Sequence, residues 1–302
     1  MKEMVMEEMV MEKMGMKKSR AFVAVLAAAL LFAAAGAVSA AETAPVRLGV
    51  TISESPEATL KKYQPLADYL SRKVGRPFEV RPVKSYDDIL SLMKSGEADL
   101  GVLGSIAGSE ALHRGEVVPV ARPEKGGVST YRGLFIVRKD GGAKKVEDLR
   151  GKSFDSNGGS ASVGKFFPRE LLRERKLDFD TFFSKVTTSS KHDTVVYKVL
   201  NREADCGTVK DSVFEKLAKS DERVKGELAI LATSQPFPDG NVMFRKAAPA
   251  DLVTNTRRAL LGMAEDPEAK PALDAFGADR FIPSPAKDYE AIVKSIITLG
   301  KK

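Results

Sequence analysis

The sequence predicts an α/β fold, in which short strands alternate with helices of roughly 10 to 18 residues. Short apolar runs such as VRLGVTI (46–52) are followed by segments whose apolar residues recur at helical spacing. This order favours parallel sheets with right-handed crossovers. Two stretches, GEADLGVLGS from Gly96 and READCGTVKD from Arg202, also share one form: each follows a helical pattern and gives a short strand that ends in a loop. The shared form predicts two similar lobes, with chance similarity as the alternative.

The first elements carry clear start and stop signals. An amphipathic pattern predicts a helix over 56–74, with Gly75 where a helix end favours a left-handed residue. Ser85 begins the next helix as its N-cap, and Asp88 follows at capping-box spacing. The other elements predicted in this half are strands at 77–83, 98–104, 117–123 and 131–139 and a helix from Ser105 to about Arg114.

The second half continues the alternation and then becomes mainly helical. SFD and ADCGTV predict strands, and GSASVGKFFPRELLRER, KHDTVVYKVLNRE and DSVFEKLAKS predict helices. A strand is expected at 227–234, and helices are expected at 249–264, 269–276 and 286–299.

The first 40 residues have the three-part pattern of a secretory signal peptide. A basic region at 17–20 precedes an uncharged apolar run at 21–37, and small residues lead to a cleavage point after Ala40 or Ala41. The Met/Glu-rich segment in front is unlike a signal peptide, which favours Met16 as the true start. An uncleaved anchor is the alternative, because the run is marginal for a span of about 20 residues.

The composition narrows the class of protein. The single cysteine, Cys206, cannot form an intrachain disulfide and lies far from the cleavage point, so we expect a soluble periplasmic monomer without a lipid anchor. The formal net charge of +7 suits a small anion, but the basic residues are scattered, so nucleic acid is not expected. Two histidines and one cysteine give no metal-ligand spacing, and we expect no cofactor.

The stretch GSASVGKF (159–166) nearly matches a nucleotide P-loop. Phe166 stands where a P-loop needs a hydroxyl for its metal, which argues against a nucleotide. The stretch opens a predicted helix, whose free backbone N–H groups and positive dipole end favour an anion. Ser160 and Ser162 add hydroxyl donors; a serine that only caps the helix is the alternative.

Five further residues are candidates for a ligand site. His192 and Asp193 open a helix, where the imidazole can donate to an anion and the carboxylate either orients the ring or caps the helix. No serine or cysteine lies in an activation motif, so no catalytic triad is predicted. Tyr86 and Tyr131 lie at the edges of elements, where they line a cleft or simply pack. Asp239 either reads a ligand's amine or a protonated oxyanion, or forms a turn.

The order of seven segments resembles the phosphonate/phosphite-type periplasmic binding proteins, the solute-binding components of ABC importers. The segments are YQPLADYLSRKVGRPFEV, SYDDILSLMKSGEADLGVLGS, TYRGLFIVRK, VEDLRGKSF, SASVGKFFP, KHDTVVYKVLNREADCGTV and FPDGNVMFRK. The resemblance covers nearly all of 46–299. It implies a type II periplasmic binding protein with two α/β lobes, a hinge and an interlobe cleft. Such a protein captures a small oxyanion for a membrane permease and is not an enzyme.

The resemblance also implies domain boundaries and site residues. Lobe 1 would combine 42–133 with 236–302, and lobe 2 would hold 134–235, with crossings near 131–139 and 234–244. The implied ligand-binding set is Tyr86, Ser105, Tyr131, Ser160, Ser162, His192, Asp193 and Asp239. Within it, Tyr86 and Tyr131 match cleft tyrosines, and Ser162 and His192 match anion donors. Asp239 falls near a carboxylate that reads an amino group in aminoalkylphosphonate binders.

The chain departs from the family pattern in the loop after 98–104, which runs Gly104-Ser105-Ile106 where the family usually has Gly-Pro and then an aromatic residue. It also departs at three positions that lose a hydroxyl. Ala161 and Val163 replace hydroxyl residues of the helix start, and Gly133 replaces the serine usual after the tyrosine. Each lost donor costs about 1–3 kcal/mol against a desolvated charged oxygen. Either the site binds another oxyanion or a less polar ligand, or the Ser160 hydroxyl replaces a lost donor. The alternatives to an importer component are a sensor that presents its ligand to a receptor, a small hydrolase using His192, and an interaction protein with an inactive cleft.

Overall fold

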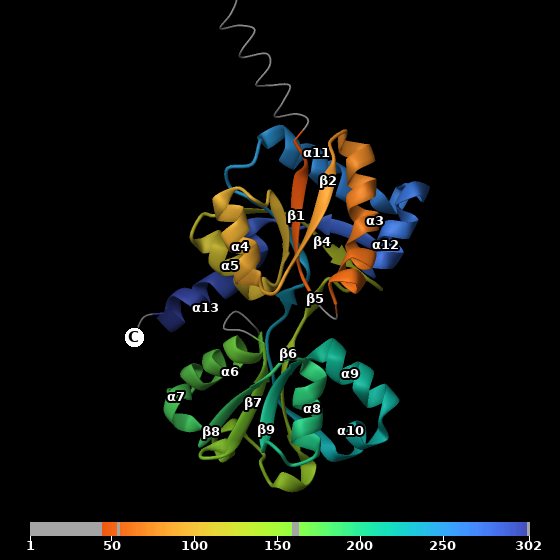
Figure 1. The fold of residues 1–302 in the computed structure, drawn as a ribbon. Coiled ribbons are helices and arrows are strands. Elements are labelled where there is room, and N and C mark those ends of the chain that lie inside the picture. Colours follow the sequence, from red (N-terminus) through yellow and green to blue (C-terminus); the bar gives the residue numbers. More distant parts are fainter. Residues whose placement is uncertain (1–43, 53–54, 159–162, 301–302) are drawn as a thin grey trace, which may run out of the picture. The chain divides into compact units, whose positions relative to one another are not determined.

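The computed structural model describes residues 44–52, 55–158 and 163–300, with the side chain of Lys165 left out. The predicted signal peptide and two predicted ligand-binding residues, Ser160 and Ser162, lie outside this part of the chain. The described residues from 46 onward form two main sheets, and helices cover both faces of each sheet (Figure 1). The predicted α/β class is confirmed.

The first sheet has the strand order β13-β4-β12-β3-β1-β2. Its strands are β1 (Val46–Thr51), β2 (Phe78–Val83), β3 (Leu100–Leu103), β4 (Val117–Glu124), β12 (Asn241–Arg245) and β13 (Arg280–Pro283). One face carries α3 (Pro56–Val74), α11 (Ala250–Leu261) and α12 (Lys270–Phe276), and the other carries α4 (Tyr86–Ser95) and α5 (Ser105–His113). Each face therefore has its own apolar core.

The second sheet has the order β10-β6-β9-β7-β8. Its strands are β6 (Gly133–Arg138), β7 (Ser153–Asn157), β8 (Lys185–Ser189), β9 (Cys206–Lys210) and β10 (Leu228–Thr233). One face carries α6 (Val163–Glu174) and α7 (Phe179–Phe182), and the other carries α8 (His192–Leu200), α9 (Asp211–Ser220) and α10 (Glu222–Glu227). The two sheets share one layout, because β1, β3 and β12 are ordered as β7, β9 and β6 are.

The helix boundaries follow the local signals in the sequence. Ser55 caps α3 by accepting from the Ala58 N–H at 3.1 Å, and Gly75 ends it in the left-handed region at φ 74°. Ser85 and Asp88 form both hydrogen bonds of the predicted capping box at the start of α4. These predicted starts and stops are confirmed.

The expectation of wholly parallel sheets is wrong for three strands. β1, β2 and β3 are parallel, and so are β7, β8 and β9. In contrast, β12 and β6 run antiparallel to both neighbours, and β13 runs antiparallel to β4. β12 and β6 arrive directly from the other sheet along an extended segment, so no helical crossover sets their direction.

The strand predicted over 131–139 is broken in two. Thr130–Tyr131 forms β5, which pairs with β11 (Phe237–Pro238), and the chain enters the second sheet only at Gly133. Between them, the Arg132 N–H donates to the Asp211 carboxylate at 2.8 Å. Periodicity alone could not show this change of partner. The strands β8 and β13 were also missed.

The stretches GEADLGVLGS and READCGTVKD share their form because an aspartate makes the same contact in each sheet. Asp99 accepts from the Arg47 N–H of β1 at 3.1 Å, and Asp205 accepts from the Ser153 N–H of β7 at 2.8 Å. Asp99 thus connects the start of β3 to the start of β1, and Asp205 connects the start of β9 to the start of β7.

The glycines of the two stretches are equivalent as well. A Cβ on Gly101 would lie 2.5 Å from Ile89 of α4, and one on Gly207 would lie 2.6 Å from Val195 of α8. Each glycine lets a helix lie close against its sheet. The shared form therefore reflects shared topology, and the alternative of chance similarity is not needed.

Among the described residues, both a strand pair and a helix join the two sheets. The first is the β5–β11 ribbon, where the rings of Tyr131 and Phe237 lie 5.8 Å apart. The second is α13 (Glu290–Gly300), which contacts both α5 and α6, with the Ser295 hydroxyl donating to Glu170. The lobe boundaries stay a prediction. That prediction placed α13 wholly in lobe 1, whereas the helix contacts helices of both sheets.

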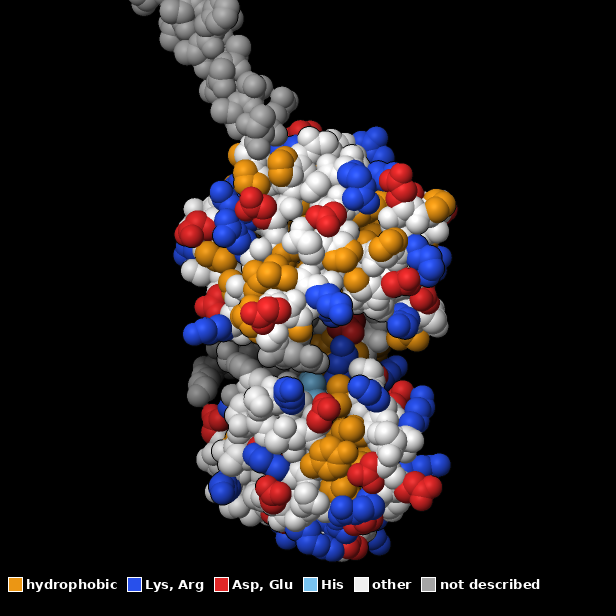
Figure 2. Space-filling view, turned by 45° about the vertical axis from the view of Figure 1, so that its right-hand side comes forward, with side chains coloured by type: hydrophobic (Ala, Val, Ile, Leu, Met, Phe, Trp, Pro, Cys, Tyr) orange, Lys and Arg blue, Asp and Glu red, His pale blue; other side chains and the backbone are white. Residues whose placement is uncertain are grey.

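Two surface properties bear on function. In the part of the chain that the structure describes, no helix is both long and apolar enough to cross a membrane. On the face shown in Figure 2, Lys/Arg and Asp/Glu side chains are interspersed.

Asp155 holds the second sheet together near the end of β7. Its fully buried carboxylate accepts from Thr187 and from Ser189 at 2.6 Å, and Lys198 of α8 donates to it at 3.2 Å. We expect Asp155→Asn to lower the free energy of unfolding by about 1–3 kcal/mol, because an amide cannot satisfy these three donors. Urea unfolding measures this change.

Asp274→Asn is the matched control. Asp274 is exposed and pairs with Lys270 four residues earlier, so its loss should cost at most about 0.5 kcal/mol. Equal losses in the two variants would contradict the role given to Asp155.

Candidate ligand-binding cavity

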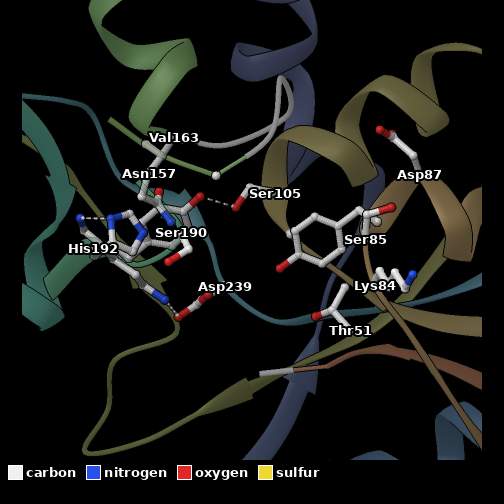
Figure 3. A pocket seen from close by; sticks show the side chains of 15 residues that line it. Thr51, Lys84, Ser85, Asp87, Ser105, Asn157, Val163, Ser190, His192 and Asp239 are labelled. Carbon is white, nitrogen blue, oxygen red and sulfur yellow. Dashed lines mark hydrogen bonds and ion pairs between the residues drawn. The ribbon is translucent and has the colours of Figure 1, made fainter. Parts of the chain in front are cut away.

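A cavity of about 470 Å³ lies between the two sheets, where the parallel strands of each sheet end. Residues of both sheets and of the β5–β11 ribbon line it. Figure 3 shows Thr51, Ser85 and Asp87 on one side and Asn157, Ser190 and His192 on the other. The carboxyl ends of parallel strands are the usual place for a ligand in open α/β sheets.

Four helices begin at this cavity. Their first residues, Tyr86 of α4, Ser105 of α5, Val163 of α6 and His192 of α8, all line it. Among the described residues, no side chain caps α5 or α8, so their first backbone N–H groups have no side-chain acceptor. The positive dipole ends of four helices thus meet at one cavity, which favours an anion.

His192 is held as a neutral donor. The Lys210 backbone N–H donates to its Nδ1 at 3.3 Å, so the proton of the neutral ring lies on Nε2. Burial and, to a smaller extent, the positive charge of Lys210 lower the pKa of His192 to about 4, while Asp193 opposes this shift. At neutral pH the ring therefore offers an uncharged N–H to the cavity.

Tyr86 and Tyr131 are also neutral donors. Burial raises the pKa of both phenols, and the Asp239 carboxylate adds to this rise. The Tyr131 hydroxyl lies 3.1 Å from the fully buried hydroxyl of Ser105, which donates to the Pro238 carbonyl. Ser105 is thereby committed to the ribbon, and the phenol groups and helix N–H groups face the cavity.

One ion pair crosses the cavity from the second sheet to the ribbon. Lys210 Nζ at the end of β9 lies 2.5 Å from Asp239 Oδ2 and 4.5 Å from the centroid of the Tyr131 ring. The side chains of Lys210 and Asp239 are 23% and 42% exposed. The carboxylate that lines the cavity therefore has its charge compensated from within the protein.

The near P-loop holds no metal-binding residue at its last position. Phe166 is buried and its ring lies 6.1 Å from that of Phe237 in the ribbon. Gly164 lies against the end of β7, where a Cβ would be 3.1 Å from the Asn157 backbone. This close approach brings the start of α6 to the cavity. No group of three metal-ligating residues occurs among the described residues.

The structure brings together most of the predicted site. Tyr86, Ser105, Tyr131, His192 and Asp239 line the cavity. Asp193 is exposed and is not among the lining residues, and Ser160 and Ser162 lie outside the described residues.

Sequence reasoning missed several lining residues, among them Thr51, Lys84, Ser85, Asp87, Ser190 and Lys210. Lys210 had a signal, because it takes the place in READCGTVKD that Gly104 takes in GEADLGVLGS, directly after an equivalent strand. The same comparison makes Tyr86 and His192 equivalent, since each opens the helix before that strand. Ser190 had none, because the strand β8 before it was not predicted.

The chain is similar in sequence to known transport proteins. The family model for the periplasmic substrate-binding protein of phosphonate ABC transporters matches residues 48–289. A probable ABC transporter phosphite-binding protein, PhnD1 of Prochlorococcus marinus, is 21% identical over 277 residues, covering 85% of this chain and 89% of that protein.

Solved structures share the fold. PhnD1 of Prochlorococcus marinus in complex with methylphosphonate has a TM-score of 0.69 at 18% identity, covering 85% of this chain and 99% of that one. XAC2383 of Xanthomonas citri has TM-scores of 0.74 bound to chloride, at 21% identity, and 0.75 bound to ATP, at 20%. The match covers 84% and 85% of this chain and 98% of the other chain in both. These matches confirm the type II periplasmic binding protein fold.

The depressed pKa of His192 has a consequence for stability. The folded chain keeps this ring neutral down to about pH 4, whereas a histidine in the unfolded chain takes up a proton near pH 6.5. The unfolded state therefore gains stability as the pH falls from about 6.5 toward 4. We expect the unfolding free energy of the chain, minus that of His192→Asn, to be constant above about pH 7 and to decrease below 6.5.

Urea unfolding of both proteins across this range measures the difference. The subtraction removes the contribution of carboxylates that titrate in the same range. A difference independent of pH would show that the ring is not kept neutral.

Proposed function

The chain belongs to the phosphonate-binding family of ABC transporter periplasmic substrate-binding proteins, and we propose that it captures a small phosphorus oxyanion of the phosphonate or phosphite kind. The observation that carries the proposal is the meeting of four helix starts at one cavity, beside the neutral donors of His192, Tyr86 and Tyr131. Backbone N–H groups and neutral donors bind an oxyanion without a matching number of cations. The family implies a membrane permease as partner, and delivery to it completes the proposed role.

The geometry supports binding rather than catalysis. His192 Nδ1 accepts from a backbone N–H, so no carboxylate orients this ring as in a catalytic triad. The proposed binding residues are Tyr86, Tyr131 and His192, with Ser105 holding the ribbon. Ser160 and Ser162 remain candidate donors on sequence grounds.

Ligand capture would close the cavity by rotation about the ribbon. The oxyanion would contact the starts of α4 and α5 on one side and of α6 and α8 on the other. Contacts to both sides stabilise the closed form relative to the open one, which is the condition for a ligand to shift the equilibrium. The closed form is the one that would dock on the permease.

Thermal unfolding with a ligand panel tests the proposal. The panel holds methylphosphonate, phosphite, phosphate, sulfate, small sulfonates and carboxylates, and ATP. A ligand at 100 times its Kd adds about 2.7 kcal/mol and raises the midpoint by a few degrees. We expect this shift with at least one phosphonate or with phosphite.

Two histidine variants locate the site. His192→Ala should abolish the shift because it removes a donor from the cavity. His113→Ala should keep it, because His113 is exposed at the end of α5 and does not line the cavity. No shift with any phosphorus oxyanion, or a full shift in His192→Ala, would contradict the proposal.

A further inference from the structure

The ion pair between Lys210 and Asp239 is built into the cavity. The lysine is held along its length: its backbone N–H donates to His192, and its Nζ lies over the Tyr131 ring and against Asp239. The aspartate is held too, because its backbone N–H donates to the Ser129 carbonyl at 3.1 Å. The pair therefore has a defined place, unlike two charges that meet by chance on a surface.

The pair changes what Asp239 can offer a ligand. An uncompensated carboxylate in an anion cavity would attract an ammonium group at the far end of the ligand. Here Lys210 Nζ already lies 2.5 Å from that carboxylate. A ligand ammonium would have either to displace the lysine or to share the carboxylate with it, which would place two cations beside one carboxylate.

A second lysine adds to this effect. Lys62 of α3 is close enough for the charges of Asp239 and Lys210 to act on it. Its pKa is lowered, mainly by burial and further by Lys210, while Asp239 opposes the change. The surroundings of Asp239 thus already hold two basic side chains.

We propose that Lys210 takes the place of a ligand ammonium at Asp239, so that the cavity selects small phosphorus oxyanions with an uncharged substituent and rejects those with an ammonium group. The inference rests on the proposed function and specifies its ligand class. Lys210 is a specificity-determining residue in this scheme. Because the pair is partly exposed, its replacement should alter selectivity without preventing folding.

Two ligands of equal size test the proposal. Propylphosphonate and 2-aminoethylphosphonate differ only in a terminal methyl or ammonium group. Isothermal titration of the full chain should give a Kd for propylphosphonate about tenfold or more below that for 2-aminoethylphosphonate. Lys210→Met keeps the apolar stem and should reduce this ratio by about tenfold, because it frees Asp239 for the ligand ammonium.

Two further variants complete the design. Lys270→Met removes a lysine that is exposed, pairs with Asp274 and does not line the cavity, and it should leave the ratio within about twofold. Adding Asp239→Asn to Lys210→Met should restore the ratio, because the carboxylate that would attract the ammonium is gone. The thermal midpoint of each variant shows that it is folded.

The outcomes separate this inference from the proposed function. An unchanged ratio in folded Lys210→Met, or tighter binding of 2-aminoethylphosphonate by the unsubstituted chain, would overturn the inference alone. So would binding of methylphosphonate but of neither larger ligand, which would make size the selecting property. Binding of no phosphonate and no phosphite would overturn the proposed function and the inference together.

Discussion

The structure depends on the requirement that one chain crosses between two sheets twice at the same place. The crossings meet as β5 and β11, whose pairing brings Tyr131 and Phe237 together. Each crossing then delivers one antiparallel strand, β6 or β12, into an otherwise largely parallel sheet. Since the parallel strands of both sheets end toward the ribbon, the loops after them and the helices that follow share one cavity. The position of the cavity therefore follows from the connectivity of the chain and does not depend on which residues line it.

Equivalent positions in the two sheets give the cavity its chemistry. Tyr86 opens α4, which packs on β3 with Ile89 against Gly101. In the same way, His192 opens α8, which packs on β9 with Val195 against Gly207. The two sides therefore present one neutral ring donor each beside a helix start. Lys210 at the end of β9 and Asp239 beside the ribbon add opposite charges that compensate each other.

The sequence predicted those features that local signals specify. The Ser85 capping box and the Gly75 helix end each depend on residues within about one helical turn, so they could be predicted without tertiary structure. The Asp99 and Asp205 stretches could be recognised only by their similarity to each other, because the hydrogen bonds of both aspartates reach 52 residues along the chain. The break of the predicted strand at Arg132 could not, because it depends on Asp211, far away in the chain.

The same limit applies to the site. Tyr86 was predicted because it lies at the edge of an element and His192 because it opens a helix, and the resemblance to a known family supported both. Ser190 follows an edge strand whose sequence, KVTTS, has little apolar character, so it carried no signal. That Lys210 meets Asp239 depends on contact between β9 and the ribbon, which no spacing along the chain records.

The C-terminal helix has a consequence for the mechanics of the molecule. The ribbon joins the two sheets at one place, and α13 joins them again by packing on both α5 and α6. Two bodies attached at two separate points keep one easy rotation, about the line through both attachments, while twisting about other axes strains one of them. We therefore expect any rotation of one sheet relative to the other to occur mainly about the line that joins the ribbon to α13.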